Sequence, residues 1–110
     1  MYVVKRSHHN PILTPYRDHN WESFATFNLS VVKKGNTFYG MYRAIGAVDM
    51  LRTPQQISII GLGNSKDKTH FEQCVPFIIP KEEWEKYGCE DPRITYFEGQ
   101  YYTRIQTLEI

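Results

Sequence analysis

Two segments with the pattern of a β-hairpin are the feature that most constrains how this chain can fold. Each consists of β-branched and aromatic residues on both sides of a polar turn, which contains Gly35 in the first segment and Gly99 in the second. This pattern is typical of antiparallel strand pairs. The expected strands cover residues 29–32, 37–42, 94–97 and 101–105. The two turn glycines lie 64 positions apart, which predicts a repeated antiparallel unit such as the blade of a β-propeller.

The rest of the chain adds one expected strand and one short expected helix. Residues 56–63 read as a strand whose glycines suggest a bulge or close approach to a neighbouring backbone. Residues 80–88 have early acids, a late lysine and a final glycine, which predicts about two helical turns. A stable array needs about three or more repeat units. We therefore expect residues 1–110 to be the N-terminal part of one larger domain, comprising the first blade and part of the second.

Charge and hydropathy exclude several classes of function. The formal net charge is +1, and the short cluster Lys33-Lys34 is too small for a nucleic-acid interface. No apolar run approaches the roughly 20 residues of a membrane helix. The N-terminus becomes charged within residues 1–6, unlike a signal peptide, which predicts a cytoplasmic protein. Cys74 and Cys89 are then expected to be reduced thiols.

The motif Glu90-Asp91-Pro92-Arg93 concentrates charge at the start of the expected strand 94–97. A residue before proline prefers extended geometry, and a proline fits best at the first residue of a strand. Neighbours in an extended chain point to opposite sides, so the two acids are not expected to face one sugar as a catalytic pair. At most one is expected to face a ligand, and the other is expected to pair with Arg93 or cap a loop. From the residues alone, a structural turn and a catalytic site both remain open.

Two further polar residues and a group of histidines are candidates for binding. Asn28 lies at a strand entrance, where it could equally close a turn. Arg43 ends an aromatic strand, and its planar guanidinium suits hydroxyls, carboxylates or phosphates, although a surface salt bridge also fits. His8, His9 and His19 lack a carboxylate or further ligand at a recognised spacing, so no metal site is expected.

The order of these motifs gives the chain a resemblance to a known family. The motifs are Asn10–Pro15, Trp21-Glu22, Phe27-Asn28, Tyr42-Arg43-Ala44, Ser58–Gly63, His70-Phe71 and Gly88–Ile94. With these motifs in this order, the chain resembles the N-terminal part of the enzymes of glycoside hydrolase family 130, which are β-mannoside phosphorylases and hydrolases. The resemblance runs from about residue 10 to residue 103. It implies a five-bladed β-propeller roughly three times as long, with its active site in the central pocket.

The resemblance also implies roles for individual residues. Asp91 would be the general acid that protonates the leaving oxygen, in the phosphorylases through a sugar hydroxyl. Asn28 and Arg43 would line the mannose subsite, and Glu90 and Arg93 are expected to contribute to substrate binding. No cofactor or metal is implied, and inorganic phosphate would be the co-substrate of a phosphorylase. The expected partner is an oligosaccharide substrate. Binding to nucleic acid or to a membrane is not expected. A homo-oligomer is compatible with this interpretation.

Three positions depart from the family pattern. Leu29 stands where proline usually follows the asparagine, and Ile59 stands where arginine is usual. Residues 104–110 replace an aromatic, tyrosine-containing strand. Our hypothesis for the last change is a truncation or a shift of reading frame near residue 103.

The function implied by the resemblance is inverting phosphorolysis of β-mannosides to mannose 1-phosphate. Hydrolysis by the same family is one alternative, because the residues that bind phosphate or activate water are expected in later blades. A non-catalytic carbohydrate-binding module is a second alternative, and a small interaction protein with exposed strand edges is a third. The 110-residue chain alone is expected to be inactive.

Overall fold

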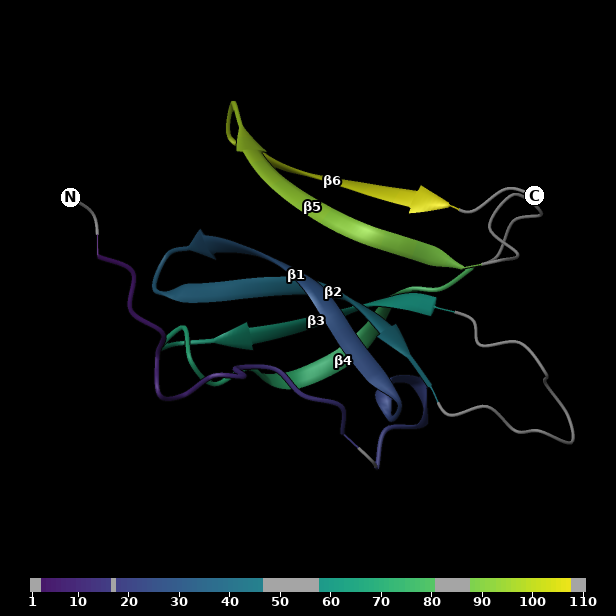
Figure 1. Cartoon of the computed structure of the whole chain (residues 1–110). Coiled ribbons are helices and arrows are strands. Elements are labelled where there is room, and N and C mark those ends of the chain that lie inside the picture. The colour runs from purple at the N-terminus through teal and green to yellow at the C-terminus, as the bar shows by residue number, and fades with distance from the viewer. Residues whose placement is uncertain (1–2, 17, 47–57, 81–87, 108–110) are drawn as a thin grey trace, which may run out of the picture.

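The computed structural model describes residues 3–16, 18–46, 58–80 and 88–107. These ranges contain six strands and one short 3₁₀ helix, which form two antiparallel sheets (Figure 1). The elements are η1 Asn20–Glu22, β1 Ala25–Lys34, β2 Thr37–Ile45, β3 Ser58–Ser65, β4 Glu72–Ile78, β5 Cys89–Phe97 and β6 Gln100–Thr107. The expected all-β class is confirmed for the described residues.

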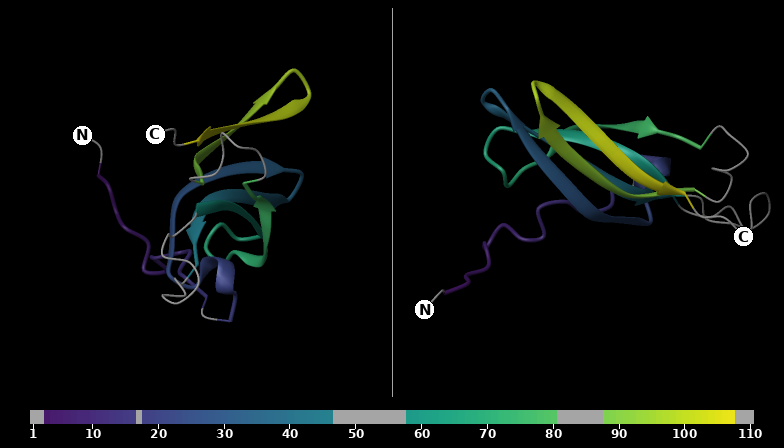
Figure 2. Two further views of the ribbon diagram at one scale, coloured as in Figure 1. Left: turned by 90° about the vertical axis from the view of Figure 1, so that its right-hand side faces the viewer. Right: turned by 90° about the horizontal axis from the view of Figure 1, so that it is seen from above.

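The first four strands form one sheet in the order β1-β2-β3-β4, and β5 and β6 form a separate hairpin. Figure 1 shows this hairpin lying over one face of the four-stranded sheet, and the end-on view in Figure 2 shows it as a second layer. The N-terminal segment runs along the other side of the sheet (Figure 1). The four-stranded sheet is thus covered on both faces.

The two hairpins repeat with a period of 63 residues, one fewer than the spacing of their turn glycines. In the first hairpin Lys34 pairs with Thr37, and in the second Phe97 pairs with Gln100. The glycines occupy different turn positions: Gly35 is the first turn residue of its hairpin, whereas Gly99 is the second of its own. The repeat is therefore set by strand pairing, and the glycine spacing of 64 was an imprecise guide to it.

The core is split between the two faces of the four-stranded sheet. Between the sheets, the buried residues Met41, Ile60 and Cys89 pack with Leu62, Ile78, Ile94 and Ile105. On the other face, Tyr42, Ala44 and Ile59 pack with Leu13, Trp21, Leu29 and Cys74. Successive residues of a strand point to opposite faces, so β2 and β3 contribute to both clusters.

A buried carboxylate ties the N-terminal segment to β2. The Glu22 side chain is almost fully buried, and its Oε1 accepts a hydrogen bond of 3.0 Å from the Tyr42 hydroxyl. Its Oε2 lies 2.6 Å from His19 Nδ1. Burial, followed by the neighbouring Cys74, raises the pKa of Tyr42 far above its ordinary value, which keeps this hydroxyl a neutral donor. Because Tyr42 precedes Arg43, this anchor holds β2 immediately beside a candidate site residue.

Strand β4 was not predicted, and the expected helix cannot be compared. Strand β4 contains Pro76, and a proline within an apolar run argues against a strand in the middle of a sheet. The structure resolves this conflict by placing β4 at the edge of the sheet. The expected strand 56–63 is found from Ser58 to Ser65, and residues 56–57 lie outside the described residues. Most of the expected helix, residues 81–87, also lies outside them.

Replacing Gly61 with alanine is predicted to destabilise the chain. A Cβ atom at Gly61 would lie 2.7 Å from the Tyr42 ring and 2.8 Å from the Trp21 ring, both on the buried face. Overpacking of this kind costs about 1–3 kcal/mol. Urea denaturation should show the corresponding loss, whereas Thr95→Ala, at an exposed position on β5, should leave the midpoint close to that of the parent. An unchanged midpoint for Gly61→Ala would contradict the packing described.

The turn that joins β3 to β4 is predicted to lose stability in acid. The Asp67 carboxylate accepts hydrogen bonds from the His70 ring, from the backbone of Thr69 and His70, and from the Ser65 hydroxyl. The His70 ring and these donors hold the pKa of Asp67 far below its ordinary value. A depressed pKa stabilises the fold above the unfolded value of about 3.9, and this contribution disappears as the pH falls.

The thermal midpoint of Asp67→Asn should therefore lie below that of the parent at pH 6, and the gap should narrow at pH 3. Asp18→Asn, which changes an exposed carboxylate without a partner among the described residues, provides the control. A gap of equal size at both pH values would show that Asp67 does not act through its charge.

Candidate functional site

Two β-bulges meet where the hairpin crosses the first sheet. In β1 the register shifts between Phe27 and Ser30, and in β5 it shifts between Glu90 and Arg93. Each shift adds one residue to its strand, and the two shifts are 63 positions apart. Bulges redirect side chains and are frequent beside active sites. The two repeats thus carry the same irregularity at the same position.

Asn28 and Asp91 occupy these bulges and contact each other. Asn28 has φ of 57° and Asp91 has φ of 47°, in the left-handed region. Asparagine and aspartate enter this region more readily than other residues with a side chain, at a cost of about 1–2 kcal/mol each. The Asn28 amide donates from Nδ2 to Oδ1 of Asp91. A side chain from each sheet is therefore directed to one point.

A second polar contact joins the sheets beside the first. Arg43 Nη2 lies 2.8 Å from Glu90 Oε1, and the two side chains are only 22% and 20% exposed. The guanidinium carbon of Arg43 also lies 4.7 Å from the centre of the Phe27 ring. Arg43 Nε is buried and has no hydrogen-bond partner among the described residues. The guanidinium is fixed by an acid and a ring, and it retains donors for an oxygen-rich ligand.

Two expectations for the acidic motif were wrong. Pro92 is not the first residue of a strand, because β5 begins at Cys89 and contains the motif. Asp91 is not extended, and Glu90 and Asp91 do not diverge: both contact the first sheet, Glu90 at Arg43 and Asp91 at Asn28. The bulge explains both results, because the extra residue interrupts the alternation of the strand.

One of the two alternatives for the second acid was an ion pair with Arg93, and no such pair is found among the described residues. Arg93 Nη1 instead donates to the carbonyl oxygen of Pro92 at 2.9 Å. Asp91 and Arg93 line a cavity of about 250 Å³ together with Arg104 and Gln106. The structure therefore gathers Asn28, Arg43, Glu90 and Asp91 at the junction of the sheets and leaves Arg93 beside them.

Sequence reasoning missed Ser30 as a member of this site. Its hydroxyl accepts a hydrogen bond of 3.1 Å from the backbone amide of Ile94, in the other sheet. Nothing in the local pattern marks this contact, because the two residues are 64 positions apart. The sequence therefore offered no signal for this contact.

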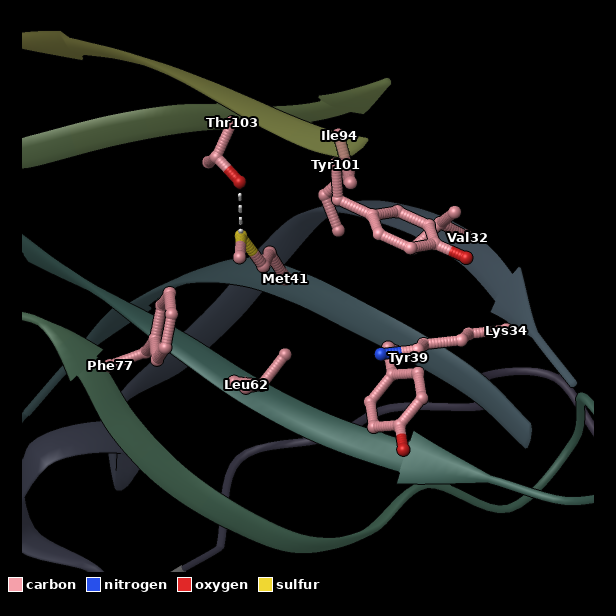
Figure 3. Close-up of a pocket in the computed structure, with 9 residues that line it drawn as sticks. All are labelled: Val32, Lys34, Tyr39, Met41, Leu62, Phe77, Ile94, Tyr101 and Thr103. Atoms are coloured by element: carbon pink, nitrogen blue, oxygen red, sulfur yellow. Dashed lines mark hydrogen bonds between the residues drawn. The ribbon is translucent and has the colours of Figure 1, made fainter. Parts of the chain in front are cut away.

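A cavity of about 400 Å³ lies between the sheets, closer to the hairpin turns (Figure 3). Its lining is mainly apolar and consists of Val32, Lys34, Tyr39, Met41, Leu62, Phe77, Ile94, Tyr101 and Thr103. The Thr103 hydroxyl donates to the sulfur of Met41 at 3.5 Å across this space (Figure 3). Among the described residues that line this cavity, none carries a carboxylate or an imidazole, so we assign it to packing between the sheets.

Within the described ranges, no group of three or more histidine, cysteine, aspartate or glutamate residues is arranged to hold a metal ion. The same part of the chain contains no helix long and apolar enough to cross a membrane.

Comparison with known proteins identifies relatives over nearly the whole chain. A family model described as β-1,4-mannooligosaccharide phosphorylase matches residues 3–105. The chain is 37% identical over 109 residues to the β-1,2-mannobiose phosphorylase of Thermoanaerobacter sp. (strain X514), covering 93% of the chain and 36% of the relative. It is 33% identical over 103 residues to the 1,2-β-oligomannan phosphorylase of the same organism, covering 93% and 35%.

The chain is also similar in structure to solved glycoside hydrolases. A glycosyl hydrolase from Bacteroides ovatus aligns with a TM-score of 0.74 and 26% identity, over 94% of this chain and 33% of that one. A structure described with the family-130 hydrolases that target β-1,2 mannosidic linkages in Candida mannan aligns with a TM-score of 0.73 and 25% identity, over 91% and 33%. The relatives are enzymes that act on glycosidic bonds. The chain belongs to glycoside hydrolase family 130, and it spans about a third of the length of these relatives.

The contact between Arg43 and Glu90 is predicted to couple the two sheets energetically. Both side chains are largely buried, and truncating one leaves the other without its charged partner. A double-mutant cycle with Arg43→Ala and Glu90→Ala, measured by urea unfolding, should give a coupling energy of about 0.5–3 kcal/mol. Additive effects of the two changes would contradict a direct contact in solution.

Proposed function

We propose that this chain is the first blade and the first half of the second blade of a five-bladed β-propeller. We further propose that the whole protein cleaves β-mannosides by inverting phosphorolysis and releases mannose 1-phosphate. The observation that carries the proposal is the Asp91 carboxyl held by Asn28 where two repeats meet. The curated relatives, both named as phosphorylases of β-1,2-linked mannosides, favour phosphate as the second substrate.

The repeat geometry supports the propeller. In the described residues, β1 to β4 form an antiparallel sheet of four strands, which is the composition of a propeller blade. A second hairpin with the same register and the same bulge stacks on the face of that sheet. Five units of about 63 residues would make a chain about as long as the relatives, of which this chain covers about a third.

The contact with Asn28 supports a role for Asp91 as the general acid. The Asn28 amide donates to Oδ1, so this oxygen serves as an acceptor and Oδ2 remains to carry the proton. In the proposed reaction Oδ2 delivers this proton to the leaving oxygen, directly or through an adjacent sugar hydroxyl, as the glycosidic bond breaks. Phosphate attacks the anomeric carbon from the opposite face, which inverts its configuration.

Arg43 and Glu90 complete the sugar-binding side of the site. The Arg43 guanidinium forms its ion pair with Glu90. This arrangement leaves Asp91 in contact with the neutral amide of Asn28. The remaining Arg43 donors would bind mannose hydroxyls, and Arg93 would contribute from the adjacent cavity. The phosphate site would belong to the remainder of the protein, and the demand for inorganic phosphate fits a cytoplasmic enzyme.

Hydrolysis is the second candidate function. A similar solved structure is described with hydrolases that target β-1,2 mannosidic linkages. In that case Asp91 keeps the role of acid, and a carboxylate elsewhere in the protein would activate water. The higher identity to the phosphorylases favours phosphorolysis.

A chimaera tests the role of Asp91. Residues 3–105 would replace the matching third of the Thermoanaerobacter β-1,2-mannobiose phosphorylase, and release of mannose 1-phosphate from β-1,2-mannobiose would be measured. Asp91→Asn is expected to lower kcat about 10²–10⁴-fold, because the acid is lost, while sugar binding is spared.

The unaltered relative is the positive control, and near-ultraviolet circular dichroism checks that the chimaera folds. A folded chimaera that is inactive, or one in which Asp91→Asn keeps its full activity, would remove Asp91 from the proposed role. Release of free mannose instead of the phosphate ester would select hydrolysis.

A further inference from the structure

We propose that Ser30 is a positioning residue that orients Asp91 through the backbone of β5 without itself touching the substrate. The inference rests on the proposed role of Asp91 as the acid. Its basis is the hydrogen bond of 3.1 Å from the Ile94 amide to the Ser30 hydroxyl. This bond joins the two sheets three residues beyond Asp91.

Strand β1 contacts β5 through two side chains that lie two residues apart and so point to the same face of the sheet. Asn28 and Ser30 both reach β5, whereas Leu29, between them, packs with the cluster on the opposite face of the sheet. Their two partners differ in kind, because Asn28 contacts the Asp91 side chain and Ser30 contacts the backbone at Ile94. One contact alone would allow the segment to pivot, and the second contact fixes its direction.

The bulge in β5 makes this second contact important. The ladder between β5 and β6 is interrupted from Glu90 to Arg93, so pairing within the hairpin does not support the backbone around Asp91. The Ser30 hydroxyl accepts a hydrogen bond from Ile94, one residue after Arg93, where pairing with β6 resumes. It therefore restrains the segment from the neighbouring sheet just beyond the interruption.

The expected consequence is a loss of turnover with substrate binding retained. A misplacement of about 1 Å at a reacting group can cost about 10²-fold in rate. In the chimaera, Ser30→Ala should lower kcat about tenfold or more while KM stays within about twofold. Ser30→Thr keeps the hydroxyl and suits a strand, so it should restore kcat to within about threefold of the parent.

A matched control separates positioning from general stability. The Ser65 hydroxyl accepts backbone hydrogen bonds from Asp67 and Lys68 in the turn after β3, away from the bulges. Ser65→Ala should lower the thermal midpoint without changing kcat. Equal kcat losses in Ser30→Ala and Ser65→Ala, or no rescue by Ser30→Thr, would overturn the proposal.

Hydrogen exchange in the 110-residue chain tests the contact independently of activity. Ser30→Ala should accelerate exchange of the Ile94 amide at least about tenfold, while amides in the ladder between β2 and β3 keep their rates. An unchanged Ile94 rate overturns the proposal whether or not the chimaera is active. A chimaera that keeps full activity with Asp91→Asn would instead refute the proposed function and leave the exchange result to decide the contact.

Discussion

The contact between Asn28 and Asp91 is the interaction on which the arrangement of the site depends. Each residue occupies a bulge, each has a positive φ, and each comes from a different sheet. Left-handed backbone is costly for residues with a side chain, and here it occurs at the equivalent position of two repeats. Neither bulge alone brings the two side chains together, so the site is a property of stacked repeats.

The surrounding structure supports this contact from both faces of the first sheet. On one face, Tyr42 is held by the buried carboxylate of Glu22. On the other face, the next residue, Arg43, is held by Glu90. Because successive side chains of β2 point to opposite faces, this strand connects the packing of the N-terminal segment to the polar contacts between the sheets. Asp91, beside this charged pair, contacts the neutral amide of Asn28.

Local patterns predicted the strands better than they predicted the site. Both hairpins were predicted from turn chemistry and residue type. Strand β4 was missed because it contains Pro76, and the local sequence does not show that this strand lies at the edge of the sheet. Asn28, Arg43 and Asp91 were singled out through the family resemblance. Their contacts could not be predicted, because a bulge reverses the expected direction of a side chain, and the partner of Glu90 lies 47 positions away.

A crystal structure of the chimaera with β-1,2-mannobiose and no phosphate would test the central claim most directly, since the glycosidic bond would stay intact. The account predicts an Asp91 carboxyl oxygen about 3 Å from the glycosidic oxygen or from a hydroxyl beside it, with Asn28 still bonded to the other carboxyl oxygen. A sugar bound elsewhere, with the Asp91 carboxyl directed away from it, would contradict the account.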